Sequence, residues 1–201
     1  MRFAIPPEYS DRTVVPEEYL GPLGIPTLGW LANEAAFITL VAEDEHILKG
    51  SAAGLKIPDI AAFLKANYGT TFSHDAIERR RDKISSDLLA TCILHAGRIA
   101  IEAGIVPVDH PKPGQIIPDV LPQNVETLDL LSRGYTPAQV AKLQGIQPPT
   151  VHSRTKPIYR ALEVNDITLA TIRAYPAGLL HHLTPRQRLP ADDPVLAPFL
   201  H

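Results

Sequence analysis

Basic side chains gather in one stretch of this chain, where they could hold the phosphates of a nucleic acid. Residues 132–160 contain five basic residues and no acidic one. Lysine and arginine neutralise phosphates, and both can hydrogen-bond guanine in the major groove of duplex DNA. The whole chain carries a net charge of -3, and residues 1–50 hold eight acidic residues against three basic ones. The charge pattern therefore favours nucleic-acid binding locally and opposes it over the chain as a whole.

Other kinds of chemistry find little support. The eight histidines show no metal-ligand spacing, no glycine-rich loop could cradle a phosphate, and no serine or cysteine lies in a nucleophile context. We therefore expect no enzymatic activity, no cofactor and no metal site. Cys92 is the single cysteine, and its apolar neighbours predict a small buried hydrophobe. No apolar run is long enough for a membrane span, and no signal peptide is evident, so we expect a cytoplasmic protein associated with the nucleoid, with no membrane contact.

Helical periodicity and caps predict an all-α chain. Apolar residues recur at three- and four-residue spacing, Ser73 can cap a helix start, and Gly104 can end one. Pro157 falls inside one predicted helix, where it should cause a kink or a late start. The predicted helices cover residues 31–48, 59–66, 73–84, 88–103, 125–132, 137–144, 148 or 150–162, and 167–174.

Prolines divide this helical chain into parts. Four of them fall within residues 107–118, which cannot be helical and should form a semi-stiff linker. The predicted organisation is an irregular N-terminal arm at 1–27, a first module at 28–106, a proline-rich linker at 107–120, a second module at 121–182 and a proline-rich tail at 183–201.

The two modules resemble each other in sequence. Moving residues 77–106 forward by 74 positions gives eight identities in 30, where chance gives about two. Farther upstream the offset becomes 80, pairing Gly54 with Gly134. The first copy thus has six extra residues between its second and third helices, and we interpret the pattern as an internal duplication.

In the second copy, a short turn at Gly145 joins two predicted helices, as in a helix-turn-helix whose second helix enters the major groove of DNA. Helical spacing places the apolar Val151, Ile158 and Leu162 on one face. The polar and basic residues project elsewhere, toward solvent or DNA; they are His152, Ser153, Arg154, Lys156 and Arg160.

This run of residues resembles the helix-turn-helix domain of LuxR/FixJ-type bacterial regulators, without a gap over nearly 60 residues. The matching positions are Glu126, Leu128, Leu130, Leu131, Gly134, Thr136, Val140, Ala141, Ile146, Thr150, Val151, Ile158, Tyr159, Arg160, Leu162, Val164, Ala170, Ala174, Gly178, Leu179 and Leu180. The resemblance covers about the last third of the chain and extends weakly, through the repeat, to residues 40–106.

The resemblance implies a four-helix domain whose third helix contacts bases and whose fourth often supports dimerisation. By position, the base contacts would come from His152, Ser153, Arg154 and Lys156, with Thr136, Thr150 and Arg160 toward the DNA backbone. The chain departs from the family at Gln139, Gln144 and Gln147, where an acidic residue, a leucine and a capping serine are usual.

The first copy offers a weaker second set of DNA contacts. Its candidates are Ser73, His74, Arg79, Arg80, Arg81 and Lys83. Three acidic residues lie among them, so a solvated, mixed-charge helix face explains the pattern equally well.

The sequence therefore predicts two tandem helix-turn-helix modules in a bacterial transcriptional regulator that binds duplex DNA selectively. Helices 93–103 and 167–174 are expected to pack as a pseudo-dimer within one chain, and a homodimer is the alternative. The competing interpretation is an interaction module of the same fold, which binds RNA polymerase, a sigma factor or another regulator without reading DNA. The acidic N-terminal part and Pro157 favour that alternative.

Overall fold

The chain folds into helices joined by short turns. The computed structural model describes residues 15–36, 38–109, 111–112, 117–183 and 195–199, and these contain no β-strand, which confirms the all-α prediction for that part of the chain. Most of the predicted arm, the centre of the linker and most of the tail lie outside the described residues. The α-helices are α1 (Leu28–Ala35), α2 (Ala42–Ala52), α3 (Ile57–Tyr68), α4 (His74–Asp87), α5 (Ile93–Glu102), α6 (Pro122–Ser132), α7 (Pro137–Leu143), α8 (Pro148–Ala161) and α9 (Ile167–Ala174).

The predicted helix over residues 31–48 is wrong, because two helices, α1 and α2, occupy this region. Residues 38–41 between them are not helical, and Val41 has the extended backbone of an N-cap with a 55% exposed side chain. The β-branched residues in this segment favour extended backbone. The break lets both helices pack against α5.

The predicted helix over residues 88–103 is also too long. Leu88 is the C-cap of α4, and Leu89 adopts a left-handed φ of 54° that ends the helix. The next helix, α5, begins only at Ile93. Cys92, just before it, is exposed, which corrects the prediction that it is buried.

Pro157 neither breaks nor delays its helix. The α8 helix runs from Pro148 to Ala161 with Pro157 in its interior. Its first turn begins with two prolines, which suit that position because the first amides of a helix have no partner within it.

The helix bounds follow the two offsets found in the sequence. An offset of 80 carries both ends of α2 onto the ends of α6, and an offset of 74 carries both ends of α4 onto those of α8. The left-handed caps follow too, since Leu89 and Glu163 have φ values of 54° and 53°. The six extra residues fall mainly in α3, which has 12 residues where α7 has 7.

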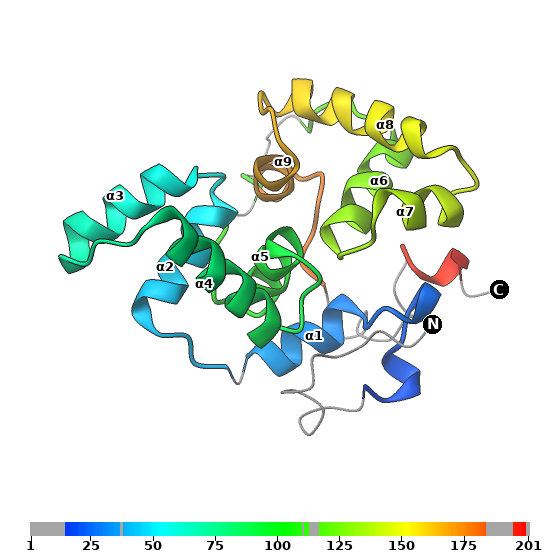
Figure 1. Cartoon of the computed structure of the whole chain (residues 1–201). Helices are drawn as coiled ribbons and strands as arrows, with labels where there is room; N and C mark the ends of the chain where they lie inside the picture. The colour runs from blue at the N-terminus through cyan, green and yellow to red at the C-terminus, as the bar shows by residue number, and fades with distance from the viewer. Residues whose placement is uncertain (1–14, 37, 110, 113–116, 184–194, 200–201) are drawn as a thin grey trace.

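One hydrophobic cluster spans both halves of the chain. Its buried residues include Ile99 and Ala100 of α5 together with Ala170 and Ala174 of α9. These two helices are in contact near the centre of the molecule, with α2–α4 on one side and α6–α8 on the other (Figure 1). The expected packing of helices 93–103 and 167–174 is therefore present.

Two glycines at helix ends form reciprocal contacts between the halves. Gly134 follows α6, and a Cβ there would lie 2.3 Å from Nδ1 of His95 on α5. Gly54 follows α2, and a Cβ there would lie 2.2 Å from Cγ of Leu169 on α9. Gly54 corresponds to Gly134 and His95 to Leu169 under the two offsets, so each half makes the same contact with the other.

The described parts of the arm and the tail pack onto the second half. A smaller cluster joins Ile25 of the arm and Leu196 of the tail to Leu130, Val140 and Val151, all buried. The short 3₁₀ helix Ala197–Phe199 lies beside the N-terminal segment in Figure 1. The described parts of the arm and the tail therefore complete the core beneath α7 and α8.

None of the described helices combines the length and the apolar character needed to cross a lipid bilayer.

Candidate nucleic-acid interface

A tight turn places α8 across α7, and local hydrogen bonds define where each helix starts. Thr136 caps α7, since its hydroxyl accepts from the amide of Gln139 and the Gln139 side chain accepts from the amide of Thr136. The side-chain amide oxygen of Gln139 thus makes the second hydrogen bond of a capping box. Gly145 in the following turn has φ +61°, and α8 begins directly after Gln147.

The α8 helix buries one face and exposes the opposite one. Val151 and Ile158 are fully buried, as predicted from the sequence. His152, Lys156 and Arg160 are exposed and follow one another at four-residue spacing, which places them in one stripe along the helix. We call these three residues the α8 stripe. Ser153 is exposed beside the stripe, and Thr150 is half-buried in the first turn.

Arg154 lies on a different flank of α8 from the stripe. Its Nη1 donates to Oε1 of Gln144 at 2.9 Å, and the hydroxyl of buried Thr127 lies 2.9 Å from the same oxygen. Arg154 is therefore tied to the turn between α7 and α8. Gln144 was missed as a site residue, although its departure from the usual leucine was a signal.

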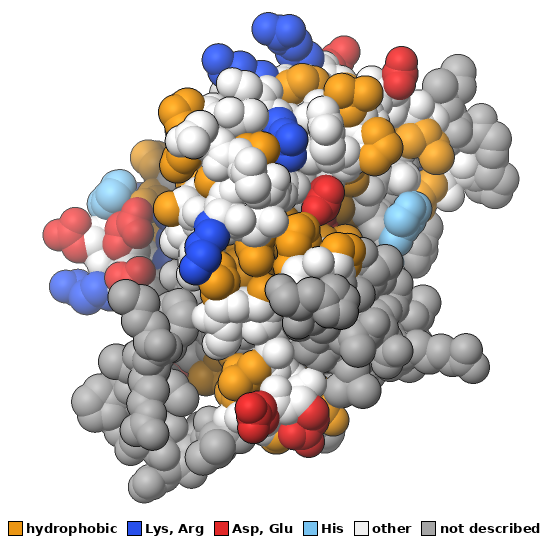
Figure 2. All heavy atoms as spheres, turned by 90° about the vertical axis from the view of Figure 1, so that its right-hand side faces the viewer, with side chains coloured by type: hydrophobic (Ala, Val, Ile, Leu, Met, Phe, Trp, Pro, Cys, Tyr) orange, Lys and Arg blue, Asp and Glu red, His pale blue; other side chains and the backbone are white. Residues whose placement is uncertain are grey.

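Arg133 does not belong to the exposed basic surface. It is 4% exposed, and its guanidinium contacts Oδ2 of Asp129 at 2.7 Å. The remaining basic residues of the stretch, Lys142, Arg154, Lys156 and Arg160, are exposed or half-buried. Figure 2 faces the α7 and α8 side and shows lysine and arginine side chains along the upper edge, at the level of α8, with acidic side chains farther along that edge.

A buried group of charged residues joins the two halves behind this surface. Arg98 on α5 lies 3.1 Å from Asp129 on α6 and 3.4 Å from Glu102. Glu102 also accepts from the hydroxyl of Tyr175, whose ring lies under the Arg98 guanidinium. Spacings of four residues in Arg98–Glu102 and Asp129–Arg133 were the available sequence signal.

Burial and neighbouring charges shift the pKa values of side chains in and beside this buried group. Burial and the nearby Arg98 and Arg133 lower the pKa of His95 from 6.5 to about 3, so this histidine is neutral at pH 7. Burial raises the pKa of the Asp129 carboxyl, but the two arginines outweigh that effect and hold the pKa below its ordinary value. Burial is also the main cause that raises the pKa of Tyr175.

In the first copy, two of the candidate residues make defined contacts within the protein. Ser73 caps α4 through the amide of Ala76. Arg80 contacts buried Asp44 at 2.5 Å and lies over the ring of Phe72. This arginine corresponds to Arg154 in the repeat and, like it, is held from the flank of its helix.

The other candidates of α4 have acidic neighbours. Arg81 contacts Glu78 at 3.4 Å, and Lys83 contacts Asp87 at 2.6 Å. His74 lies 4.0 Å from Asp75, and Arg79 is exposed. Under the offset of 74, the α8 stripe corresponds to Glu78, Asp82 and Ser86.

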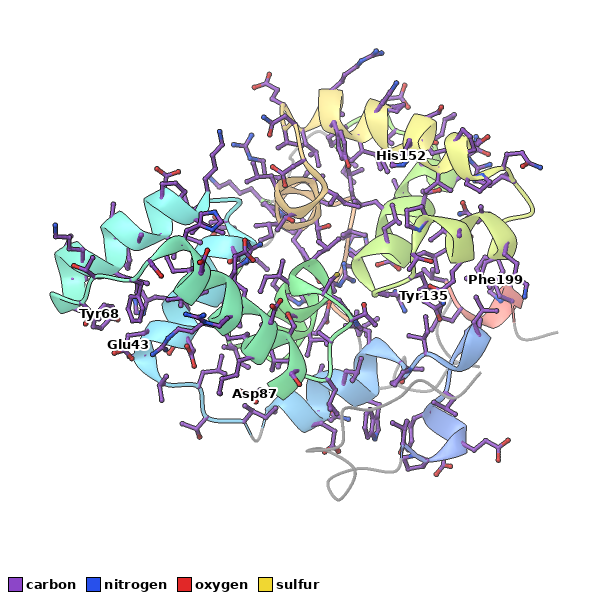
Figure 3. All side chains as sticks on the ribbon, viewed as in Figure 1. Glu43, Tyr68, Asp87, Tyr135, His152 and Phe199 are labelled. Carbon is purple, nitrogen blue, oxygen red and sulfur yellow. The ribbon has the colours of Figure 1, made fainter. Side chains whose placement is uncertain are left out.

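The two corresponding faces therefore differ in the sign of their charge. The predicted residues gather into a basic stripe on α8, whereas the same positions on α4 are acidic or neutral. His152 of the stripe lies far from Tyr68 at the tip of α3 (Figure 3). Within the described ranges, no three His, Cys, Asp or Glu side chains are grouped so that they could hold a metal ion.

No protein-family profile, curated protein or solved structure matches this chain significantly. The similarity to LuxR/FixJ-type domains stays a prediction from the residues.

Proposed function

We propose that this chain is a DNA-binding transcriptional regulator built from two tandem helix-turn-helix modules, of which only the second reads duplex DNA. The observation that carries the proposal is the α8 stripe. His152, Lys156 and Arg160 are exposed in a row on a helix that follows a tight turn, and no acidic residue lies within residues 132–160. Such a helix can neutralise phosphates and present donors to base edges in the major groove.

The remaining candidates divide by position. Ser153 lies beside the stripe and can donate to a phosphate or base. Thr136 and Thr150 stand at the starts of α7 and α8, where the positive end of the helix dipole favours phosphate contacts. Arg154, held by Gln144, supplies charge from the flank. A protein that acts in this way would reside on the bacterial nucleoid.

The first module is proposed as a structural counterpart. Glu78 and Asp82 occupy the positions of His152 and Lys156, and carboxylates there would repel phosphates. Packing of α5 on α9 would then give a pseudo-dimer with one DNA-reading half. A single chain should bind one half-site, not the two of a symmetric helix-turn-helix dimer.

Fluorescence anisotropy with a labelled random duplex, at low and moderate salt, tests the proposal. Lys156→Ala with Arg160→Ala should weaken binding at least about tenfold and make the salt dependence shallower by about one unit per lost phosphate contact. Arg79→Ala with Lys83→Ala removes the same charge from α4 and is the matched control, which should bind almost as well as the unchanged protein. Equal losses in both pairs, or no binding at low salt, would contradict the proposal.

A second candidate function is binding to another protein, such as RNA polymerase. The exposed rings of Phe63 and Tyr68 on α3 favour it, since they flank His46 with centroid separations of 5.4 and 5.3 Å. Titration of purified RNA polymerase with the unchanged chain and with Phe63→Ser/Tyr68→Ser tests this function. Tight binding by the unchanged chain but not by the double variant would support this function. Equal binding by the two proteins would exclude this surface.

A further inference from the structure

A groove of about 720 Å³ opens where the two halves of the chain meet. One wall is the segment just before α5 and its first turn, with Thr91, Cys92 and Leu94. The other wall comes from the turn between α6 and α7 and from α8, including Tyr135 and His152, which Figure 3 labels. The groove therefore borders both the contact between the halves and the α8 stripe.

The lining of this groove is apolar with a few hydrogen-bonding groups. Leu94, Ile167 and the ring of Tyr159 supply partly exposed apolar surface, and buried Leu131, Tyr135 and Val151 also border the groove. The Thr91 and Thr155 hydroxyls donate to backbone carbonyls and can still accept a hydrogen bond, and the His152 ring can donate or accept one. No lysine, arginine, aspartate or glutamate lines the groove. Small-molecule sites have this mixture and this size, and the absence of charge selects an uncharged ligand.

Comparison of the two repeat copies shows which residue difference leaves the groove open. Thr155 of α8 lines the groove, and the corresponding position on α4 is Arg81. The Arg81 side chain is largely buried and contacts Glu78. The second half has a short side chain where the first half has a long one, and Tyr159 in place of Ser85 adds an aromatic wall.

We propose that this groove binds a small, uncharged, largely apolar molecule, and that its occupation changes the affinity of α8 for DNA. The second part rests on the proposed function, whereas the first does not. His152 and Thr136 belong both to the groove and to the predicted DNA contacts, so a molecule seated between α5 and α8 would compete with those contacts or alter their placement.

The neutral fluorescent compound N-phenyl-1-naphthylamine is a suitable probe of the full chain. Its fluorescence should rise and saturate at one molecule per chain. Thr155→Arg, which copies Arg81, should weaken probe binding at least about tenfold, with circular dichroism as the check on folding. Phe63→Ser removes an exposed ring from α3, outside the groove, and should leave probe binding unchanged.

Cys92 gives a second measurement that does not depend on a folded variant. Benzyl methanethiosulfonate can react only at this cysteine of the chain, and the benzyl group should then occupy the groove and abolish probe binding. Reduction with dithiothreitol should restore it. Saturable binding that survives both the benzyl group and Thr155→Arg, or no saturable binding at all, would overturn the site.

Duplex binding with and without saturating probe tests the link to DNA. The affinity should change several-fold in the unchanged chain and stay constant in the benzyl-modified chain. Probe binding without any change in duplex affinity would overturn the link, and a chain that binds probe but no DNA would overturn the proposed function while the groove stands.

Discussion

Replacing Gly134 with alanine tests the packing of the two halves most directly. Gly134 has φ +88°, and an added Cβ would lie 2.3 Å from Nδ1 of His95 and 2.6 Å from Oγ1 of Thr91. These neighbours cannot easily move, because His95 is 1% exposed and its Nδ1 accepts from the amide of Thr91. We therefore expect Gly134→Ala to destabilise the fold through both backbone strain and crowding.

The size of the effect follows from these two causes. An alanine in left-handed backbone costs about 1 to 2 kcal/mol. Crowding in a packed interior adds about 1 to 3 kcal/mol. Gly145→Ala is the matched control, because Gly145 has φ +61° and nothing within 4 Å of its Cβ position. Gly134→Ala should therefore lose about 2 to 5 kcal/mol of unfolding free energy, and Gly145→Ala about 1 to 2 kcal/mol.

Urea titration followed by circular dichroism measures both losses. The reciprocal contact provides an independent check, since Gly54→Ala would crowd Leu169 in the same way. Leu169→Ala makes room, so the double variant should lose less stability than the sum of the two single changes. If Gly134→Ala and Gly145→Ala lose the same stability, or if the double variant is additive, the halves do not pack as described.

Four further predictions concern the buried charges, α8 and the tail. Asp129→Asn removes the carboxylate that lies between the buried Arg98 and Arg133 and should cost about 3 to 5 kcal/mol in the same titration. The pKa of His95 is lowered from 6.5 to about 3, so between pH 6.5 and 3 the unfolded chain binds a proton at this residue and the folded chain does not. The free energy of unfolding should therefore fall by up to about 1.4 kcal/mol per pH unit from pH 6.5 toward 3. The fall should be steeper than in His95→Gln. Pro157→Ala restores an amide donor inside α8 and should raise the melting temperature, whereas an unchanged or lower value would show that Pro157 does not destabilise this helix. Leu196→Ala should cost about 2 to 5 kcal/mol, because Leu196 is 1% exposed in the core beneath α7, and a loss below 1 kcal/mol would show that the tail does not complete that core.

Features fixed by short-range chemistry could be predicted from the sequence. The buried face of α8 follows from the spacing of Val151 and Ile158, and the left-handed caps at Gly104 and Gly134 follow from their glycines. The spacing of apolar residues predicted a wrong helix where the segment after α1 continued the spacing of that helix. Ile38 and Val41 extend the pattern of α1, yet the chain there is not helical. Local spacing cannot show that break, since it depends on how both helices pack on α5.

Features that depend on tertiary packing could not be predicted. Arg133 counted as surface charge until Asp129 and Arg98 placed it in a buried group. Cys92 has apolar neighbours in sequence but is exposed beside a groove lined by residues of both halves. The charge of the α8 stripe was predicted, whereas the engagement of Arg80 by Asp44 in the first copy required the structure.

The two halves of the repeat are alike at some positions and differ at others, and the two sets of positions have different roles. Helix bounds, left-handed caps and the reciprocal glycine contacts are the same in both halves, and these features determine folding and mutual packing. The outward face of the third helix differs in charge, with Glu78 and Asp82 against His152 and Lys156. A surface that tolerates acidic residues in one half cannot be required there for phosphate binding. We therefore propose a DNA-reading face on α8 only. Under that proposal, a charge-reversing pair on this face, Lys156→Glu with Arg160→Glu, should abolish duplex binding while leaving the urea midpoint within the range of other surface variants.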